Sequence, residues 1–264
     1  VLPESLGVLD CEYNNLSELD LRHLINLERL NCPDNKLTAL YLPQSAALKD
    51  VKCNDNLLTA LDVSANTGLT SLICYDNNLT ELLLPADSAL TKLSCSSNEL
   101  TALDLTKTPH LEYLSCSYNK VPELDLSQLS DLNELYCSQN GLTALDVSSC
   151  PNLMNLYCYG NQLTTLDLSA NTKLEMLECD ENQISTLDLS ANTMLDTLNC
   201  KNNQISTLDL SANTMLEDLN CTNNQISTLD LSANTKLGEL YCKDNPLWYI
   251  AGVSDFDELY GCEY

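Results

Sequence analysis

The chain has 264 residues, 44% of them hydrophobic, which is enough apolar material for one or two packed domains. Its 38 acidic residues against 12 Lys and Arg give a net charge of −26, and such a field repels phosphate backbones and anionic lipid headgroups. We therefore expect no nucleic-acid partner. No run of about 18 apolar residues occurs, so we expect no membrane insertion either.

The first residues already follow a repeating frame, because Leu6 aligns with Leu27 and Leu48. We therefore expect the chain to be a mature or trimmed fragment, in which the lack of a targeting signal says little about location. No cap is visible before Leu6. The sequence thus predicts a monomer, or a dimer formed through this uncapped N-terminal end.

The cysteines define the organisation of the chain. Twelve of the fourteen stand 21 residues apart, and an asparagine follows each of them by three residues. A fixed period of 20 to 30 residues with leucines at constant offsets is typical of a solenoid. Such a fold displays a surface rather than a pocket, so the question becomes which face binds. The twelve ladder cysteines are Cys11, Cys32, Cys53, Cys74, Cys95, Cys116, Cys137, Cys158, Cys179, Cys200, Cys221 and Cys242.

Each repeat contains two stretches of alternating polarity. In residues 174–194, the pattern around Leu177 and Cys179 predicts a short strand with these two side chains inward and their neighbours outward. The later Leu-Asp-Leu stretch, 187–189, alternates in the same way. The sequence therefore predicts two extended segments and two turns per repeat, six inward apolar positions and almost no helix.

The ladder cysteines are predicted to be free, buried thiols. In a parallel stack their Cα atoms would lie about 4.8 Å apart, but parallel Cβ vectors keep the Cβ atoms further apart than a disulfide prefers. The chain has no C-x2-C pair and only two histidines, which argues against zinc. Cys150, at an inward turn position, is predicted to be a structural variant. The asparagines are predicted to bond turn backbone groups.

This pattern resembles the leucine-rich-repeat family, and within it the bacterial 21-residue (IRREKO-type) class and the cysteine-ladder repeats of internalins. The resemblance covers residues 6 to about 250. It implies a right-handed solenoid of the α/β-class horseshoe type, with a parallel β-sheet on the concave side and extended convex segments. It also implies a bacterial surface or secreted protein that binds other macromolecules. The chain departs from the family in lacking a helical N-terminal cap, an immunoglobulin-like domain and a wall-anchor motif.

The predicted domain organisation is an array of twelve 21-residue repeats over 1–245 and a C-terminal cap over 246–264. The cap contains Trp248 and Phe256, the chain's single Trp and single Phe. Because both flanks of each repeat are extended, the array is predicted to curve weakly.

Tyrosines and carboxylates gather on the predicted concave face of the middle repeats. Stacking would place Tyr136 and Tyr157 one strand apart, and tyrosines are enriched in binding hot spots. The alternative is that they only stabilise the sheet, since tyrosine is a good strand former. The predicted ligand-binding residues are Tyr75, Tyr113, Tyr118, Glu134, Tyr136, Asn155, Tyr157, Tyr159, Met176, Glu178 and Asp180.

A second candidate is the aspartate of each Leu-Asp-Leu stretch. Neighbouring carboxylates about 4.8 Å apart repel one another by roughly 1 kcal/mol in water. Hydrogen bonds from turn amides, or from the Thr or Ser three residues earlier (Thr101, Thr143, Thr164, Ser185), would offset this. Calcium bridging is the alternative; otherwise no cofactor is expected. The aspartates are Asp20, Asp62, Asp104, Asp125, Asp146, Asp167, Asp188, Asp209 and Asp230.

No catalytic constellation is visible, because His23 and His110 lie four repeats apart and no metal, phosphate-loop or nucleophile motif occurs. The sequence predicts a non-catalytic module, extracellular or at the bacterial cell surface, that recognises an extracellular protein or glycan. The alternative is a rigid structural spacer that presents another domain. The near-identical repeats over 174–236 bear on this alternative, because identical repeats cannot each be tuned to a different ligand feature.

Overall fold

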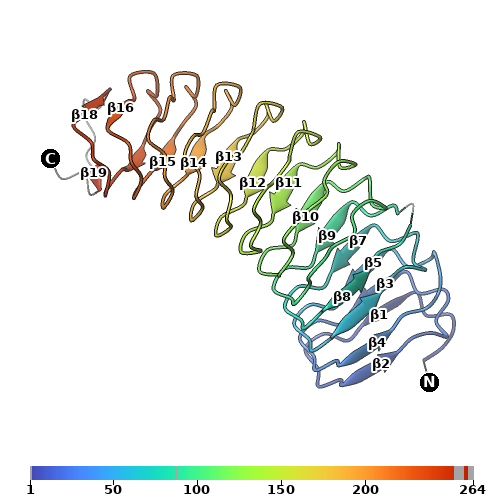
Figure 1. The fold of residues 1–264 in the computed structure, drawn as a ribbon. Helices are drawn as coiled ribbons and strands as arrows, with labels where there is room; N and C mark the ends of the chain where they lie inside the picture. The colour runs from blue at the N-terminus through green and yellow to red at the C-terminus, as the bar shows by residue number, and fades with distance from the viewer. Residues whose placement is uncertain (1, 87, 253–258, 261–264) are drawn as a thin grey trace. The chain divides into compact units, whose positions relative to one another are not determined.

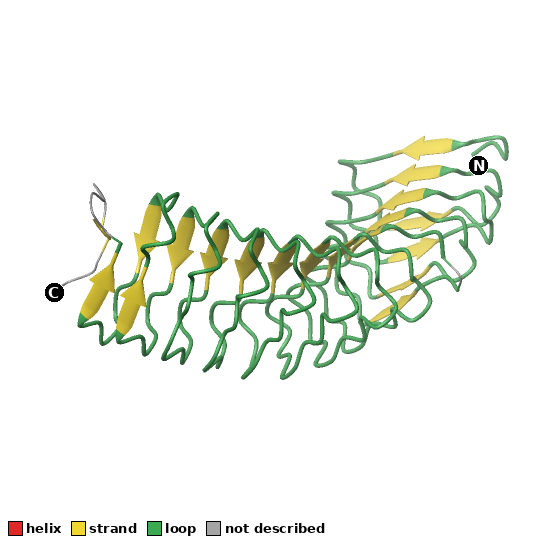
Figure 2. Cartoon of the chain, turned by 90° about the horizontal axis from the view of Figure 1, so that it is seen from above, coloured by secondary structure: helices red, strands yellow, loops and turns green. Residues whose placement is uncertain are grey.

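The computed structural model describes residues 2–86, 88–252 and 259–260 (Figure 1). It is a parallel β-solenoid of about twelve turns, as the sequence predicts. The described residues form strands, turns and loops without a helix (Figure 2), so none of them forms a helix long and apolar enough to cross a membrane. The chain divides into two compact units, Val1–Leu132 and Asn133–Tyr264.

The first unit contains six strands of a long parallel sheet. Successive strands pair in register 21 residues apart, so that Leu9 faces Leu30 and Leu30 faces Val51. Two smaller parallel pairs come from the second segments of the repeats. The long-sheet strands are β1 (Val8–Asp10), β3 (Arg29–Asn31), β5 (Asp50–Lys52), β7 (Ser71–Ile73), β9 (Lys92–Ser94) and β10 (Tyr113–Ser115); the pairs are β2 (Glu18–Asp20) with β4 (Ala39–Tyr41), and β6 (Ala60–Asp62) with β8 (Glu81–Leu83).

The second unit repeats this plan. Its long-sheet strands pair with the same 21-residue offset as far as β17, as in Leu156 facing Leu177 and Leu177 facing Leu198. These strands are β11 (Glu134–Tyr136), β12 (Asn155–Tyr157), β13 (Met176–Glu178), β14 (Thr197–Asn199), β15 (Asp218–Asn220), β17 (Glu239–Tyr241) and β19 (Leu259–Tyr260); the smaller pair is β16 (Thr228–Asp230) with β18 (Tyr249–Ala251).

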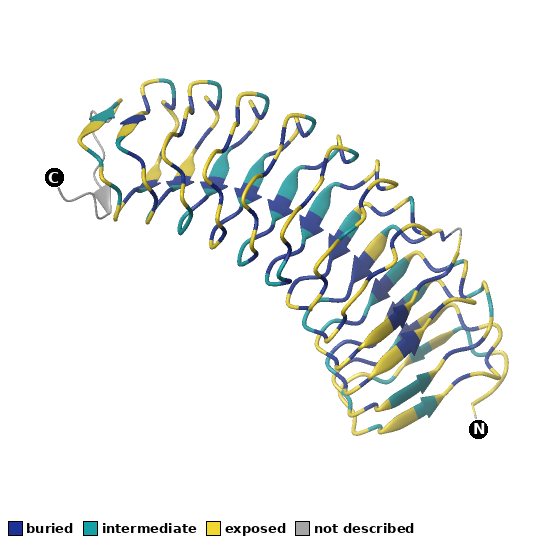
Figure 3. Cartoon of the chain, viewed as in Figure 1, coloured by how far each residue is buried: buried dark blue, intermediate teal, exposed yellow. Residues whose placement is uncertain are grey.

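The core runs through the interior of the turns (Figure 3). The predicted set of six inward apolar positions per repeat is confirmed, since all six side chains of one repeat are at most 6% exposed. Similar burial in most of the repeats is the main force that holds the turns together, because no single turn could bury these faces alone. The six are Leu174, Leu177, Cys179, Ile184, Leu187 and Leu189.

The asparagine after each ladder cysteine links adjacent turns. The Asn182 side-chain Nδ2 donates to the carbonyl oxygens of Cys158, Cys179 and Asp180 at 3.0–3.1 Å, and its Oδ1 accepts from the Leu163 amide at 3.0 Å. The residue just before it, Glu181, has a φ of 54°, as its equivalents do in the other repeats. The asparagine therefore satisfies the turn's free backbone groups and fixes a left-handed turn, which confirms its predicted structural role.

The Leu-Asp-Leu segments are mostly extended without being paired. In the described residues they form backbone ladders only in the three smaller strand pairs, so the segments from 103–105 to 208–210 carry no strand. The predicted weak curvature stays a prediction. Of the predicted cap over 246–264, residues 253–258 and 261–264, with Phe256 and Cys262, lie outside the described residues.

Candidate binding surface

The outer face of the second unit's long sheet carries most of the predicted site. Strand register places two rows of side chains across it: Glu134, Asn155 and Met176 in one row, and Tyr136, Tyr157 and Glu178 in the other. These side chains are all half-buried, and the leucine between the two rows on every strand is buried. Alternation in three-residue strands thus presents a continuous polar and aromatic surface over a leucine core.

Two tyrosines form the centre of this surface. The rings of Tyr136 and Tyr157 stack with centroids 4.3 Å apart and planes 9° apart. Their hydroxyls are held at the rim: Tyr136 donates to Glu134 Oε2 at 3.1 Å, and Tyr157 donates to Met176 Sδ at 2.7 Å. The stack is therefore fixed at both ends before any ligand arrives, which lowers the ordering cost of using it for binding.

Carboxylates border the tyrosines. Glu178 is in register with Tyr157, and its pKa is raised by burial and then by the charge of Asp180. Asp180 was predicted to point outward, but its side chain is only 7% exposed and accepts from Asn199 Nδ2 at 3.0 Å. Lys201 lies 3.7 Å from it. Asp180 therefore anchors neighbouring polar groups and is not a free contact residue. Burial also raises its pKa.

Tyr159 is the remaining predicted residue of the second unit. It follows ladder residue Cys158 and is half-buried, one repeat before Asp180. Tyr159 precedes Gly160, whose φ is 63°. The position after the ladder cysteine is therefore part of the surface at Tyr159 but buried at Asp180.

The other predicted tyrosines belong to the first unit. Tyr113 on β10 is half-buried, and the Nζ of Lys92 on β9 lies 4.6 Å above its ring centroid, a cation–π contact. Tyr75 is half-buried, and its pKa is raised by burial and then by nearby aspartates including Asp55 and Asp76. Tyr118 is 51% exposed at the left-handed turn position, with a φ of 56°.

The cysteine ladder is confirmed over most of its length. Eleven ladder cysteines, Cys11 to Cys221, are free thiols, as is Cys150, and all but the half-buried Cys11 are buried. Burial raises the pKa of Cys53, Cys116 and Cys221 to about 12. These thiols are therefore apolar core groups rather than nucleophiles.

The prediction of a free thiol is wrong at Cys242, which is disulfide-bonded. Every other ladder cysteine is free, so its partner is not a ladder neighbour. Parallel Cβ vectors disfavour a bond along the ladder only, and they place no limit on a cysteine elsewhere in the chain.

No protein-family model and no curated protein matches the chain. Among solved structures, the functional domain of InlJ from Listeria monocytogenes, which includes a cysteine ladder, matches 92% of this chain with 38% sequence identity and a TM-score of 0.86. The chain is a leucine-rich-repeat protein. It spans 55% of the length of the InlJ chain.

Two other leucine-rich-repeat structures are similar over nearly the whole chain. YopM, a leucine-rich effector protein from Yersinia pestis, shares 27% identity with a TM-score of 0.74, covering 95% of this chain and 75% of its own. An internalin, InlF, from Listeria monocytogenes shares 24% identity with a TM-score of 0.71, covering 97% of this chain and 84% of its own. The InlF likeness supports the fold alone.

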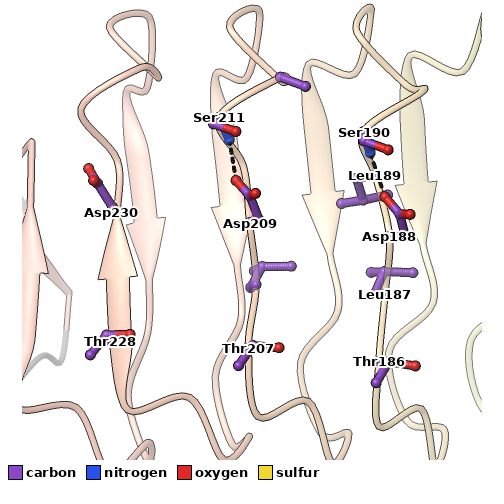
Figure 4. Close-up of a pocket in the computed structure, with 12 residues that line it drawn as sticks. Thr186, Leu187, Asp188, Leu189, Ser190, Thr207, Asp209, Ser211, Thr228 and Asp230 are labelled. Atoms are coloured by element: carbon purple, nitrogen blue, oxygen red, sulfur yellow. Dashed lines mark hydrogen bonds between the residues drawn. The ribbon is translucent and has the colours of Figure 1, made fainter.

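A groove lies over the Leu-Asp-Leu segments of the second unit (Figure 4). It measures about 580 Å³ and takes its walls from three successive repeats, with Asp188, Asp209 and Asp230 in equivalent places. In Figure 4 the threonines of the same segments, such as Thr186 and Thr207, line the groove beside the aspartates. The groove is therefore periodic, and its lining alternates polar Thr, Asp and Ser side chains with leucines.

Turn amides hold these aspartates. Oδ1 of Asp188 accepts from the Ser190 amide at 3.0 Å, and Oδ1 of Asp209 accepts from the Ser211 amide at 3.0 Å. These bonds lower the pKa of both carboxyl groups. Of the donors the sequence predicts, the turn amide two residues later is therefore confirmed. The other predicted donor, the Thr or Ser hydroxyl three residues earlier, is wrong, because an extended chain directs that hydroxyl away from the carboxylate.

No cluster of three or more His, Cys, Asp or Glu side chains that could hold a metal ion occurs in the described part of the chain. Calcium at the aspartates stays an open alternative that only a binding measurement tests.

One group of surface residues was not predicted. Five carboxylates extend the site's sheet face toward β17. Three of them stand four residues before a ladder cysteine, a position outside the predicted outward set, and all belong to repeats close to or beyond Asp180. Counting acidic residues at the strand positions of these repeats and at the position directly before each strand would have found them. They are Glu175, Asp196, Glu217, Asp218 and Glu239.

Proposed function

We propose that this chain is a non-catalytic recognition module that binds an extracellular protein or glycan through the sheet face around Tyr136, Tyr157 and Tyr159. The observation that carries the proposal is the fixed stack of Tyr136 on Tyr157. Tyrosines held rigidly on an open face give a large amphipathic contact area at low entropic cost, which is the character of binding hot spots.

Comparison along the same row supports a specialised surface. The positions in register with Tyr136 and Tyr157 hold Glu178, Asn199 and Asn220 on the next three strands, and a tyrosine returns in this row at Tyr241 on β17. Sheet stability alone does not need tyrosine here, because the buried leucine beside each of these positions supplies the packing. The aromatic pair is therefore a local feature of the surface.

A non-catalytic role agrees with the chemistry of the titratable groups. The ladder thiols are buried with raised pKa values. His110 Nδ1 lies 3.7 Å from Asp131 Oδ2, while His23 Nε2 lies 3.2 Å from the carbonyl of Leu2, so each has its own surface partner. The similar proteins are leucine-rich-repeat binding proteins, which supports the same conclusion.

We place the protein at the bacterial surface or in the secreted fraction. The likeness to InlJ supports this proposal. The disulfide at Cys242 agrees with an oxidising environment, since disulfides persist mainly outside the cytosol.

A rigid spacer is the second candidate function. The observation that favours it is the near-identity of the repeats over 174–236, which recurs in the groove as equivalent Thr, Asp and Ser side chains. A spacer needs a stable periodic rod and no specific surface.

A binding screen separates the two functions. The chain is tested against arrayed glycans and extracellular proteins, beside the triple variant Tyr136→Ser, Tyr157→Ser, Tyr159→Ser. A matched control, Tyr41→Ser with Tyr249→Ser, removes exposed tyrosines from strands of the smaller pairs. Recognition predicts a partner that the triple variant loses and the control keeps. A spacer predicts no such partner.

A further inference from the structure

Carboxylates crowd the sheet face next to the tyrosine stack. On β15, Asp218 is in register with Glu239 of β17, and Glu217 lies directly before this strand. Asp196 completes the group that raises the pKa of Asp218, after the effect of burial. Neighbouring carboxylates of like charge repel one another. The face therefore stores unfavourable electrostatic energy that a bound cation would relieve.

The chain itself supplies little positive charge here. Lys201, directly after ladder residue Cys200, pairs with Asp180 at 3.7 Å. Lys243 is the other lysine that directly follows a ladder cysteine. Among the described residues, no side chain forms an ion pair or donates a hydrogen bond to Glu178, Glu217 or Asp218. The remaining carboxylates have neutral neighbours, as in Thr197 Oγ1 donating to Asp196 and Tyr241 donating to Glu239.

The acidic face adjoins an aromatic centre. Glu178 is in register with Tyr157, so carboxylates continue directly from the stack of Tyr136 and Tyr157. The first unit shows how a cation fits such a sheet, because Lys92 Nζ lies 4.6 Å above the ring of the in-register Tyr113. Aromatic rings beside carboxylates suit Lys and Arg side chains, which use both charge pairing and cation–π contact.

From this complementarity we propose that the partner presents a Lys- and Arg-rich polypeptide segment, which lies across β12 to β15 with its cationic side chains on Glu178, Glu217 and Asp218. This inference rests on the proposed function, and it names the chemical class of the partner for the same sheet face. A metal ion fits less well, because the described residues hold no cluster of carboxylates with metal-ligand geometry.

The test must separate this surface from the overall charge of −26. The probe is a fluorescent, extended peptide in which Lys and Arg alternate with Ser. One variant carries Glu178→Gln, Glu217→Gln and Asp218→Asn. The matched control, Asp188→Asn with Asp209→Asn and Asp230→Asn, removes the same three charges from the groove over the Leu-Asp-Leu segments, where Asn still accepts the turn amide.

We expect the sheet-face variant to bind the peptide at least about tenfold more weakly than the unmodified chain, and the control less than about threefold more weakly. Equal weakening by both variants overturns the inference, since binding then follows net charge alone. An unmodified chain that does not bind the peptide at millimolar concentration also overturns it. So does equal binding of a cationic polysaccharide such as chitosan.

Failure here is distinguishable from failure of the proposed function. In one outcome, a screened partner loses binding to the triple tyrosine variant and still binds the sheet-face charge variant normally. This result would agree with the proposed recognition function and would contradict the inference of a Lys- and Arg-rich segment. If the binding of every screened partner is unchanged in both the triple tyrosine variant and the sheet-face charge variant, the proposed recognition function itself is contradicted.

Discussion

The rings of Tyr136 and Tyr157 lie nearly parallel, 9° apart, with centroids separated by 4.3 Å across adjacent parallel strands. Because the two residues are 21 apart in the chain, this contact exists only through the in-register stacking of two repeats. The candidate binding surface is thus a product of the solenoid register and not of any local segment.

The stack should contribute a measurable coupling energy. In a double-mutant cycle of Tyr136→Ser and Tyr157→Ser, we expect a coupling of about 1 kcal/mol, the usual range for an aromatic pair. Urea unfolding of the four proteins measures it. A pair from different rows of the surface, Tyr136→Ser with Asn155→Ser, is the control and should show less coupling. Additive effects in the tyrosine cycle would mean that the rings do not stack in solution.

Replacing one ladder asparagine should destabilise the protein far more than replacing the exposed residue next to it. Asn182→Ala removes four hydrogen bonds and leaves the Leu163 amide without its acceptor, so we expect a loss of roughly 2–4 kcal/mol. Gln183→Ala, at the adjacent exposed position, should change stability by less than about 0.5 kcal/mol. Thermal and urea unfolding compare the two variants. Equal losses of stability in the two variants would show that the ladder asparagines do not stabilise the turns.

The buried thiols should make the protein sensitive to alkali. A thiol whose native pKa is about 12 stays protonated when the unfolded chain has already released its proton near pH 8.5 to 9. The native state then binds more protons than the unfolded state, so stability is lost as pH rises, by roughly 1.5–2 kcal/mol per thiol at pH 10.

Circular dichroism with urea, in reductant, measures this loss between about pH 8 and about pH 10. The same burial predicts that a thiol reagent labels the native ladder slowly, and first at the half-buried Cys11. A stability that stays level to pH 10, or rapid labelling of Cys116, would show that the ladder is not enclosed.

Acid should weaken the binding of a basic peptide. Glu178 faces Asp180 and Lys201, while Asp218 faces Glu239, Glu217 and Asp196, and the pKa values of both Glu178 and Asp218 are raised. A cationic ligand favours their ionised forms, so binding releases protons and the affinity falls as pH decreases through the raised pKa values. Fluorescence anisotropy between about pH 7 and about pH 4 measures it. A constant affinity over this range contradicts a role for these carboxylates.

Calcium should not stabilise the protein through the aspartates of the Leu-Asp-Leu segments. Each of these carboxylates already accepts a turn amide, as Asp188 does from Ser190. We expect millimolar calcium to shift the melting temperature by less than about 1 °C, as magnesium would. A calcium-specific rise that is lost in Asp188→Asn with Asp209→Asn would instead establish a calcium site.

Much of the fold can be predicted from the 21-residue repeat of the sequence. Inward positions such as Leu177 and Cys179 and the asparagine ladder are predictable, because period and alternation determine which side chains enter the core. The burial of Asp180 is not predictable in this way, since it depends on Asn199 and Lys201, one repeat later, which supply its partners. Periodicity also does not reveal the disulfide of Cys242, whose partner lies outside the ladder.

The candidate site was only partly predictable for a related reason. Stacking of Tyr136 on Tyr157 follows from register alone. The acidic part of the face depends on Glu217 and its equivalents, which stand directly before the three-residue strands, where strand alternation does not determine the direction of a side chain.

Hydroxyl-radical footprinting, with and without a partner captured in the binding screen, tests most directly whether function lies on the sheet face. Radicals label exposed Tyr, Met and Trp, and the chain carries internal controls in Met194, Met215 and Trp248, which are 48%, 42% and 76% exposed and lie outside the strands of the long sheet. We expect the partner to protect Tyr136, Tyr157 and Met176 and to leave the three controls unchanged. Protection of Met194 and Met215 with unchanged labelling of the tyrosines would contradict the account.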